Sequence, residues 1–212
     1  MSTTILLTRH GETESSEADL YYGRSESVVT SRGLEQQALL AQRLNGLPIT
    51  AVYCSPLRRC AQAADLIGAY HHLVPIKIDD LVEVNHGSWE GLTRQQVTER
   101  FASSYVAWQL DPAANSPNDG ESGYEVAARV LPVLIQLART HDGETIVVMA
   151  HNTVNRIALC HFLGLPMAEY RRRIVQSPAA INELVFAGEI ARVISVNDIS
   201  HWKASGLRQE VV

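Results

Sequence analysis

The feature that most restricts the fold lies near the start of the chain, where an apolar run ends in two basic residues. A strand over residues 3–8 is apolar on both faces because Ile5-Leu6-Leu7 forms its centre, which is typical of a sheet covered by helices. Arg9, His10 and Gly11 follow directly. Ligands of such sheets bind where the strands end, and a glycine lets the backbone approach them. The pattern predicts an α/β fold with Arg9 and His10 in a loop at a binding site.

Segments of strand length alternate with helical patterns along the rest of the chain. We expect strands at 3–8, 51–54, 76–78, 145–150, 183–187 and 191–196, and helices at 32–45, from Ser55-Pro56 to about 68, at 122–140 and at 153–163. This alternation predicts a mostly parallel sheet with helices on both faces. The last two strands are separated only by Gly188-Glu189-Ile190, so we expect an antiparallel hairpin at one edge. The expected architecture is one three-layer α/β/α domain over residues 1–212.

The stretch 105–121 is the longest one without clear periodicity, and it contains an Asp-Pro pair and a Ser-Pro-Asn-Asp-Gly run. Such residues are typical of turns, and long surface loops often carry or cover binding sites. We expect a surface excursion able to cover a pocket. Tyr105 and Trp108 lie in this stretch and are the aromatic side chains that we consider as ligand contacts rather than packing residues.

The composition is that of an ordinary globular protein and excludes several classes of function. The formal net charge of −5 disfavours nucleic acid, whose binding needs a basic face. No apolar stretch approaches the roughly 20 residues of a membrane span, and the N-terminal segment lacks the basic and small-residue regions of a signal peptide. We therefore expect a cytoplasmic protein with no nucleic-acid and no membrane partner. A homodimer is left open, because nothing in the sequence fixes the oligomeric state.

Two groups of residues are interpreted as structural. Cys54, Cys60 and Cys160 have no paired spacing and lie in apolar segments, which indicates reduced core thiols rather than a disulfide framework or a zinc site. The three consecutive arginines at 171–173 form the basic cluster outside the site candidates. We interpret them as a solvated helix end.

Charged and histidine side chains follow several of the predicted strands. Arg9 and His10 follow the first strand, Arg58 and Arg59 the second, Glu83 the third and His151 the fourth. In a parallel sheet these strand ends share one edge. Two histidines, at least two arginines and one carboxylate are therefore expected to converge.

This combination of residue types favours phosphate chemistry. Arginines offer planar charged donors that match phosphate oxygens, and a helix N-terminus adds N–H groups. A neutral imidazole can attack phosphorus, and nearby guanidinium groups would keep its pKa low. The second histidine can then be a charged donor to the phosphoryl oxygens in the transition state. A carboxylic acid held neutral by burial can protonate the departing oxygen; Glu83 is the candidate, with Glu12 and Glu90 as competitors.

Four ordered blocks of the sequence resemble one known family. They are Leu7-Thr8-Arg9-His10-Gly11-Glu12-Thr13 with Gly23-Arg24, Ser55-Pro56-Leu57-Arg58-Arg59-Cys60, the Glu83–Gly91 run with Gly120-Glu121-Ser122, and Val147–Arg156 around His151. In this order they resemble the histidine phosphatase superfamily, in its phosphoglycerate mutase-like branch. The resemblance spans most of the chain and implies an α/β fold without a metal or other cofactor.

The resemblance also implies roles for individual residues. The phosphorylated histidine of the family falls on His10, its second histidine on His151 and its proton donor on Glu83. Its arginines fall on Arg9 and Arg59, since the motif places Arg59 one position after a variable residue, which is Arg58 here. These assignments agree with the residues that the strand ends indicate.

The sequence departs from the family pattern beside the expected phosphate site. The family commonly has Trp-Asn where this chain has Ser15-Ser16, so a hydroxyl stands where an amide usually touches the phosphate. Asn152 replaces the usual glycine after the second histidine, and His86 stands where many relatives carry an aromatic residue. The expected substrate-binding residues are Ser16, Tyr22, Gly23 and Asn152.

The predicted function is metal-independent hydrolysis of a small phosphorylated metabolite through a phosphohistidine. The alternative is a cofactor-dependent phosphoglycerate mutase, which resembles longer chains with an added basic segment. The corresponding stretch here, 91–119, offers only Arg94 and Arg100. A non-catalytic phosphate-binding module is the third hypothesis, which the presence of all five matched residues disfavours.

Overall fold

A computed structural model describes residues 1–188 and 190–203, and one six-stranded sheet forms in this part of the chain. Glu189 in the predicted hairpin turn and residues 204–212 of the predicted domain lie outside the described residues. The strands are β1 (Thr3–Arg9), β2 (Ile49–Cys54), β3 (Ile76–Lys77), β4 (Thr145–Ala150), β5 (Ile181–Ala187) and β6 (Ile190–Asp198). All six predicted strands are present, with ends that differ by up to two residues.

The sheet has the order β3-β2-β4-β1-β5-β6. Strands β1 to β4 run parallel, whereas β5 is antiparallel to β1 and β6 is antiparallel to β5. The predicted parallel sheet with an antiparallel edge is therefore confirmed. Arg9 at the end of β1 lies in register with Ala150 at the end of β4. This register brings the residues after the two strands, His10 and His151, to one place.

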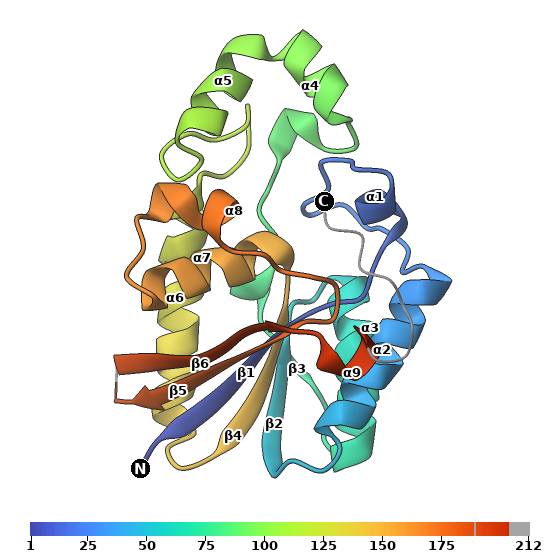
Figure 1. The fold of residues 1–212 in the computed structure, drawn as a ribbon, viewed down its shortest axis with the longest axis vertical. Coiled ribbons are helices and arrows are strands. Elements are labelled where there is room, and N and C mark those ends of the chain that lie inside the picture. The colour runs from blue at the N-terminus through green and yellow to red at the C-terminus, as the bar shows by residue number, and fades with distance from the viewer. Residues whose placement is uncertain (189, 204–212) are drawn as a thin grey trace.

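Helices cover both faces of the sheet (Figure 1). The longer helices are α2 (Ser31–Leu44), α3 (Arg58–His71), α6 (Gly123–Thr140) and α7 (Asn152–Phe162), and α9 (Ser200–Lys203) follows the last strand. Because strand side chains alternate between faces, Ile5 and Leu7 pack in the cluster with α6 and α7, whereas Leu6 packs in the cluster with α2, α3 and α9. The predicted three layers are thus present. Among the described residues, no helix combines the length and the apolar character that a membrane crossing requires.

Short helices lie beyond the carboxyl ends of the parallel strands. They are α1 (Glu14–Glu17), the 3-10 turns η1 (Asp79–Leu81), η2 (Gly87–Trp89) and η3 (Met167–Glu169), and the helices α4 (Arg94–Arg100), α5 (Ala102–Leu110) and α8 (Tyr170–Arg173). Helices α4 and α5 rise over the sheet at the top of the view in Figure 1. We call these two helices the cap.

The cap has its own apolar cluster, in which Trp89, Val97 and Trp108 are buried. The prediction of a loop from residue 105 is therefore wrong for its first part, because α5 extends to Leu110. Helix α5 is short and is buried only at Trp108, so it lacks the apolar stripe by which longer helices are predicted. Its position depends on packing against residues distant in sequence.

The predicted start of α3 at Ser55-Pro56 is also wrong. The helix begins at Arg58, and its N-cap residue Leu57 makes no side-chain capping bond. The Ser55 hydroxyl instead contacts His151 at 2.8 Å. Helices α2 and α6 are capped by Thr30 and Ser122, whose side chains accept backbone N–H groups of the first turns.

Candidate active site

A cleft of about 540 Å³ opens at the carboxyl ends of the parallel strands, below the cap. Its walls include seven of the nine predicted site residues, which are Arg9, His10, Ser16, Tyr22, Arg59, Glu83 and Asn152. Gly23 and His151 are buried and lie behind these walls. The convergence expected from the strand ends is therefore present.

His10 presents a neutral ring to the cleft. Its Nδ1 lies 2.7 Å from the carbonyl oxygen of Gly11; a carbonyl only accepts hydrogen bonds, so Nδ1 carries the proton and Nε2 the lone pair. Burial, followed by the charges of Arg59 and Arg9, holds the pKa of His10 well below 6.5. The ring therefore has the protonation state of a nucleophile, and it lines the cleft.

His151 lies edge-on to His10, with 5.2 Å between the ring centroids. Its Nε2 is 2.8 Å from the Ser55 hydroxyl and 3.4 Å from the Cys60 sulfur. Burial, Arg59 and His10 hold its pKa well below 6.5. A fully buried imidazole beside guanidinium groups is neutral at pH 7, and the role of His151 as a charged donor in the transition state stays a prediction.

Cys60 contacts His151 from the first turn of α3, yet it is not a nucleophile. The thiol donates to the carbonyl oxygen of Ala150 at 3.1 Å. Burial raises its pKa well above 9. It therefore remains a thiol, as predicted for a core cysteine.

The two predicted arginines are anchored by backbone carbonyl groups. Arg59 donates to the carbonyls of Ser25 at 3.0 Å and Gly23 at 2.6 Å. Arg9 donates to the carbonyl of Gln176, and burial together with the charge of Arg156 lowers its pKa to about 10, so it stays charged at pH 7. Arg58 is exposed. Of the two adjacent arginines, the structure brings Arg59 to the cleft.

A buried network of amide side chains supports Arg9, and sequence reasoning missed it. The Gln176 and Asn182 amides donate to each other, at 2.7 and 2.8 Å. Asn182 also donates to the carbonyl of Leu7 in β1 at 2.8 Å. Such a network fixes the end of β1 because each buried amide has its partners. A signal was present in the sequence, since Asn182 is a polar residue near the start of an otherwise mostly apolar strand.

Glu83 is held by two backbone N–H groups. Its Oε1 accepts from Val84 at 2.8 Å and its Oε2 from Thr153, in the first turn of α7, at 3.0 Å. These bonds orient the buried carboxyl group toward the cleft. Two backbone donors thus fix the position of this carboxyl group.

The two competing carboxylates have other partners. Although burial acts to raise the pKa of Glu90, hydrogen bonds from Ser25 and from three backbone N–H groups lower it. Glu90 therefore stays ionised and is occupied as an acceptor. Glu12 accepts the Thr30 hydroxyl at 2.9 Å and pairs with Arg32 at 3.4 Å. Glu83 remains the candidate acid.

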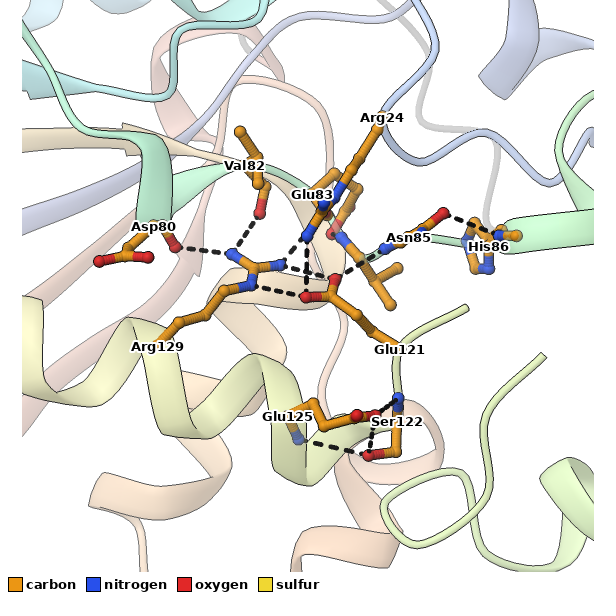
Figure 2. Close-up of polar contacts among 12 residues, drawn as sticks. Arg24, Asp80, Val82, Glu83, Asn85, His86, Glu121, Ser122, Glu125 and Arg129 are labelled. Carbon is orange, nitrogen blue, oxygen red and sulfur yellow. Dashed lines mark hydrogen bonds and ion pairs between the residues drawn. The ribbon is translucent and has the colours of Figure 1, made fainter. Parts of the chain in front are cut away.

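An ion pair outside the cleft holds the segment that carries Glu83 (Figure 2). Arg129 of α6 donates to the carbonyl groups of Asp80, Val82 and Glu83 at 2.6, 2.7 and 3.2 Å, and pairs with Glu121 at 3.0 Å. The second oxygen of Glu121 accepts the Asn85 N–H at 2.8 Å. Arg129 and Glu121 together fix the backbone on both sides of Glu83.

The predicted substrate-binding residues differ in what they can offer. The Ser16 hydroxyl donates to the Thr13 carbonyl at 2.8 Å and accepts the Thr13 N–H at 2.9 Å, so it caps α1. The Gly23 N–H donates to Glu90 at 2.9 Å, which directs it away from the cleft. Asn152 opens α7, and its buried Oδ1 has no hydrogen-bond partner among the described residues. Asn152 and Tyr22 both line the cleft.

The interpretation of 171–173 as a solvated helix end is wrong for Arg171. Its guanidinium lies 3.8 Å from the centroid of the Trp108 ring, and both residues line the cleft. Arg172 and Arg173 are exposed, as expected. The sequence could not indicate this difference, since it depends on the packing of α5 against α8.

No three His, Cys, Asp or Glu side chains within residues 1–188 and 190–203 are grouped to hold a metal ion. The positive charge of the cleft comes from arginines. The arginines can bind a phosphate group, His10 can attack its phosphorus atom, and Glu83 can transfer a proton.

Comparisons with known proteins agree with this geometry. The model of the histidine phosphatase superfamily, branch 1, matches residues 5–199. Phosphoserine phosphatase 1 of Hydrogenobacter thermophilus is 31% identical over 78% of this chain and 79% of its own length. Adenosylcobalamin/alpha-ribazole phosphatase of Escherichia coli is 30% identical over 76% of this chain and 80% of its own. Among solved structures, Bacillus stearothermophilus YhfR superimposes with a TM-score of 0.89 at 24% identity, covering 94% of this chain and 98% of that one, which shows the shared fold.

Proposed function

Because the chain belongs to the histidine phosphatase superfamily, we propose that it hydrolyses a small phosphorylated metabolite through a phosphohistidine at His10. The observation that carries this proposal is the hydrogen bond from His10 Nδ1 to the Gly11 carbonyl. It leaves a neutral Nε2 in a cleft that also contains Arg9 and Arg59. The similar proteins of Hydrogenobacter thermophilus and Escherichia coli are a phosphoserine phosphatase and an adenosylcobalamin/alpha-ribazole phosphatase.

In the first step, Nε2 of His10 attacks phosphorus and forms an N–P bond while the ester P–O bond breaks. Arg9 and Arg59 bind the non-bridging oxygens, whose charge they match. We propose His151 as a further donor to these oxygens, because its ring lies 5.2 Å from that of His10. Glu83, in its protonated form, gives its proton to the departing alkoxide oxygen.

In the second step, water attacks the phosphohistidine. Glu83, now a carboxylate, takes a proton from the water, the N–P bond breaks, and inorganic phosphate leaves. His10 returns to its neutral state and Glu83 to its protonated state. Every proton is thus carried by residues of this chain, so we propose that the reaction needs no metal.

We also propose a cytoplasmic location. Cys54, Cys60 and Cys160 are buried free thiols, which fits a reducing compartment. The structure is consistent with the proposal that residues 1–212 form one domain, since its sheet runs through both halves of the chain.

Release of phosphate from an aryl phosphate tests the proposed function, and 3-phosphoglycerate with and without a bisphosphate primer separates hydrolase from mutase. We expect phosphate release from the aryl ester without any primer. Primer-dependent formation of 2-phosphoglycerate would instead identify a mutase. Binding of phosphate without turnover or acid-labile phosphate on His10 would identify a non-catalytic module.

A further inference from the structure

Arg129 lies outside the cleft, yet all five of its N–H donors have acceptors. Its Nη1 donates to the carbonyl groups of Asp80 and Val82 at 2.6 and 2.7 Å. Its Nη2 donates to the carbonyl of Glu83 at 3.2 Å and to Oε2 of Glu121 at 3.1 Å. Its Nε donates to Oε1 of Glu121 at 3.0 Å. Arg129 thus joins one backbone segment to one carboxylate (Figure 2).

One of these bonds reaches the proposed acid through a single peptide group. The carbonyl of Glu83 and the N–H of Val84 belong to the same peptide group, and this N–H donates to Oε1 of Glu83 at 2.8 Å. Because the peptide group is planar, its two polar ends cannot turn independently. A donor on the carbonyl oxygen also polarises the group and strengthens the bond that its N–H makes. Arg129 therefore acts on the peptide group that holds the carboxyl group of Glu83.

Glu121 fixes the same segment from the other side. Its Oε2 accepts the Asn85 N–H, and its own N–H donates to the Asn85 carbonyl, both at 2.8 Å. Although burial acts to raise the pKa of Glu121, hydrogen bonds from Arg129 and from the Asn85 N–H lower it. Glu121 is therefore ionised at pH 7, and the charge of Arg129 is balanced where it binds the backbone.

The backbone that carries Glu83 depends on such contacts. Residues 83–86 belong to no helix or strand, so no regular series of hydrogen bonds fixes them. A proton donor must lie within hydrogen-bond reach of the oxygen that receives the proton. Misplacement of a reacting group by about 1 Å can cost about 100-fold in rate. The contacts of Arg129 are therefore placed to decide how well Glu83 meets the departing oxygen.

We propose that Arg129 is a positioning residue for the proton transfer and holds the carboxyl group of Glu83 toward the departing oxygen. In that step the proton passes from Glu83 to the ester oxygen while the bond of this oxygen to phosphorus breaks. The inference rests on the proposed function and adds to its site a residue outside the cleft. Loss of Arg129 should therefore affect esters in proportion to the need of their leaving oxygen for a proton.

Two aryl phosphates that differ in the basicity of the leaving oxygen measure this effect. The 2,4-dinitrophenolate ion is a weak base and departs without a proton, whereas phenolate is a stronger base and benefits from an acid. The leaving-group ratio is the kcat/KM for phenyl phosphate divided by that for 2,4-dinitrophenyl phosphate. A ratio of two substrates cancels any loss of folded enzyme, so a merely structural role of Arg129 would leave it unchanged.

Single variants then test the role of Arg129. We expect Arg129→Met to lower the leaving-group ratio by at least about tenfold, and Glu83→Ala, which removes the acid itself, by about 100-fold or more. Arg24→Met is the matched control, because Arg24 pairs with the same Glu121 at 2.8 Å but is half exposed. Its ratio should stay within about twofold. An equal fall in this control overturns the inference.

A more conservative variant decides the matter where Arg129→Met does not fold. Arg129→Lys keeps the positive charge but has three N–H donors in place of five. We expect its leaving-group ratio to fall by at least about threefold, since a point charge cannot replace a planar group of donors. In the absence of folded Arg129→Met, an unchanged ratio in Arg129→Lys overturns the inference.

A double variant tests whether Arg129 acts through Glu83. In Glu83→Ala no carboxyl group remains to be positioned, so the addition of Arg129→Met should change the leaving-group ratio by less than about twofold. A further fall of about tenfold would show that Arg129 affects the reaction by another route. That result, or an unchanged ratio in Glu83→Ala alone, overturns the inference.

The two levels of the proposal fail in different ways. Phosphate release from both esters, with the same leaving-group ratio in Arg129→Met as in the unaltered protein, overturns the positioning role alone. Absence of release from both esters by the unaltered protein overturns the proposed function and this inference with it.

Discussion

The inner and outer ends of the cleft hold their arginines differently. At the inner end, Arg9 and Arg59 donate to backbone carbonyl groups, and a buried amide network supports the strand that carries Arg9. At the outer end, Arg171 rests on an aromatic ring. Arg156, also at the outer end, is repelled by the charge of Arg171 and attracted by that of Glu83.

This difference separates the common chemistry from the choice of substrate. A phosphoryl group is the same in every ester, so the protein can position its donors permanently. The leaving group varies from one ester to another, and we infer that the outer end of the cleft contacts it. Substitutions at the inner end should therefore affect all substrates, and those at the outer end should affect only some.

The largest expected effect is the loss of the nucleophile. We expect His10→Ala to reduce phosphate release by at least about 10⁴-fold, to the same degree for every phosphate ester tested. His161→Ala is the control, because His161 is an exposed histidine on α7. Steady-state rates measure both. Substantial residual turnover in His10→Ala would show that His10 at the inner end of the cleft is not the nucleophile.

The ion pair behind Glu83 offers a matched comparison of two arginines that bind one carboxylate (Figure 2). Arg129→Met leaves three carbonyl groups and the largely buried Glu121 without their donor, so we expect the free energy of unfolding to fall by about 3 kcal/mol. Arg24 pairs with the same Glu121 at 2.8 Å but is half exposed, and Arg24→Met should cost less than about 1 kcal/mol. Urea unfolding distinguishes them. Equal losses of stability in the two variants would show that the burial of the arginine does not determine the cost of removing it.

Stability should change in opposite directions at the two ends of the cleft. We expect Gln176→Leu to lower the free energy of unfolding by about 2 kcal/mol, because it leaves buried amide groups without partners. Arg156→Met should be neutral or raise it by up to about 1 kcal/mol, because burial and the charge of Arg171 outweigh the attraction of Glu83 for this guanidinium. Thermal and urea unfolding would show whether each variant is less or more stable than the unaltered protein. A destabilised Arg156→Met would mean that this arginine is a structural residue.

The smallest expected effect is on the pH dependence of stability. The folded pKa values of His10 and His151 are held well below 6.5, so below pH 6.5 the unfolded chain binds protons that the folded chain does not. Stability is therefore lost as the pH falls below about 6.5. We expect His10→Asn to reduce this loss by a few degrees in melting temperature, whereas the exposed His161→Asn should not. An unchanged pH dependence in His10→Asn would contradict a lowered pKa.

The sequence was sufficient to predict most of the sheet and the residues at the inner end of the cleft. Arg9, His10, Glu83 and His151 follow strands whose apolar runs are clear, and parallel topology brings strand ends together whatever the loops do. Of the adjacent arginines, strand position could not choose between Arg58 and Arg59. The family motif could choose between them, because it places the conserved arginine at the position of Arg59.

The outer end was not predictable because it depends on contacts between distant short elements. Arg171 belongs to a run of three arginines, and its environment is set by Trp108 on α5, a helix with little periodicity. The hydrogen bond of Ser55 to His151 was likewise hidden, since Ser-Pro also fits a helix cap. Residues whose role comes from the packing of one loop or short helix on another leave no periodic signal.

The most direct test is to identify the atom that receives the phosphoryl group. The protein is mixed with an aryl phosphate, quenched in base within the first turnovers, digested, and analysed by mass spectrometry. We predict one phosphoryl group on the peptide that contains His10, stable in base and lost in acid, and absent from His10→Ala. Turnover with no phosphorylated peptide, or with the label on another residue, would contradict the central role of His10.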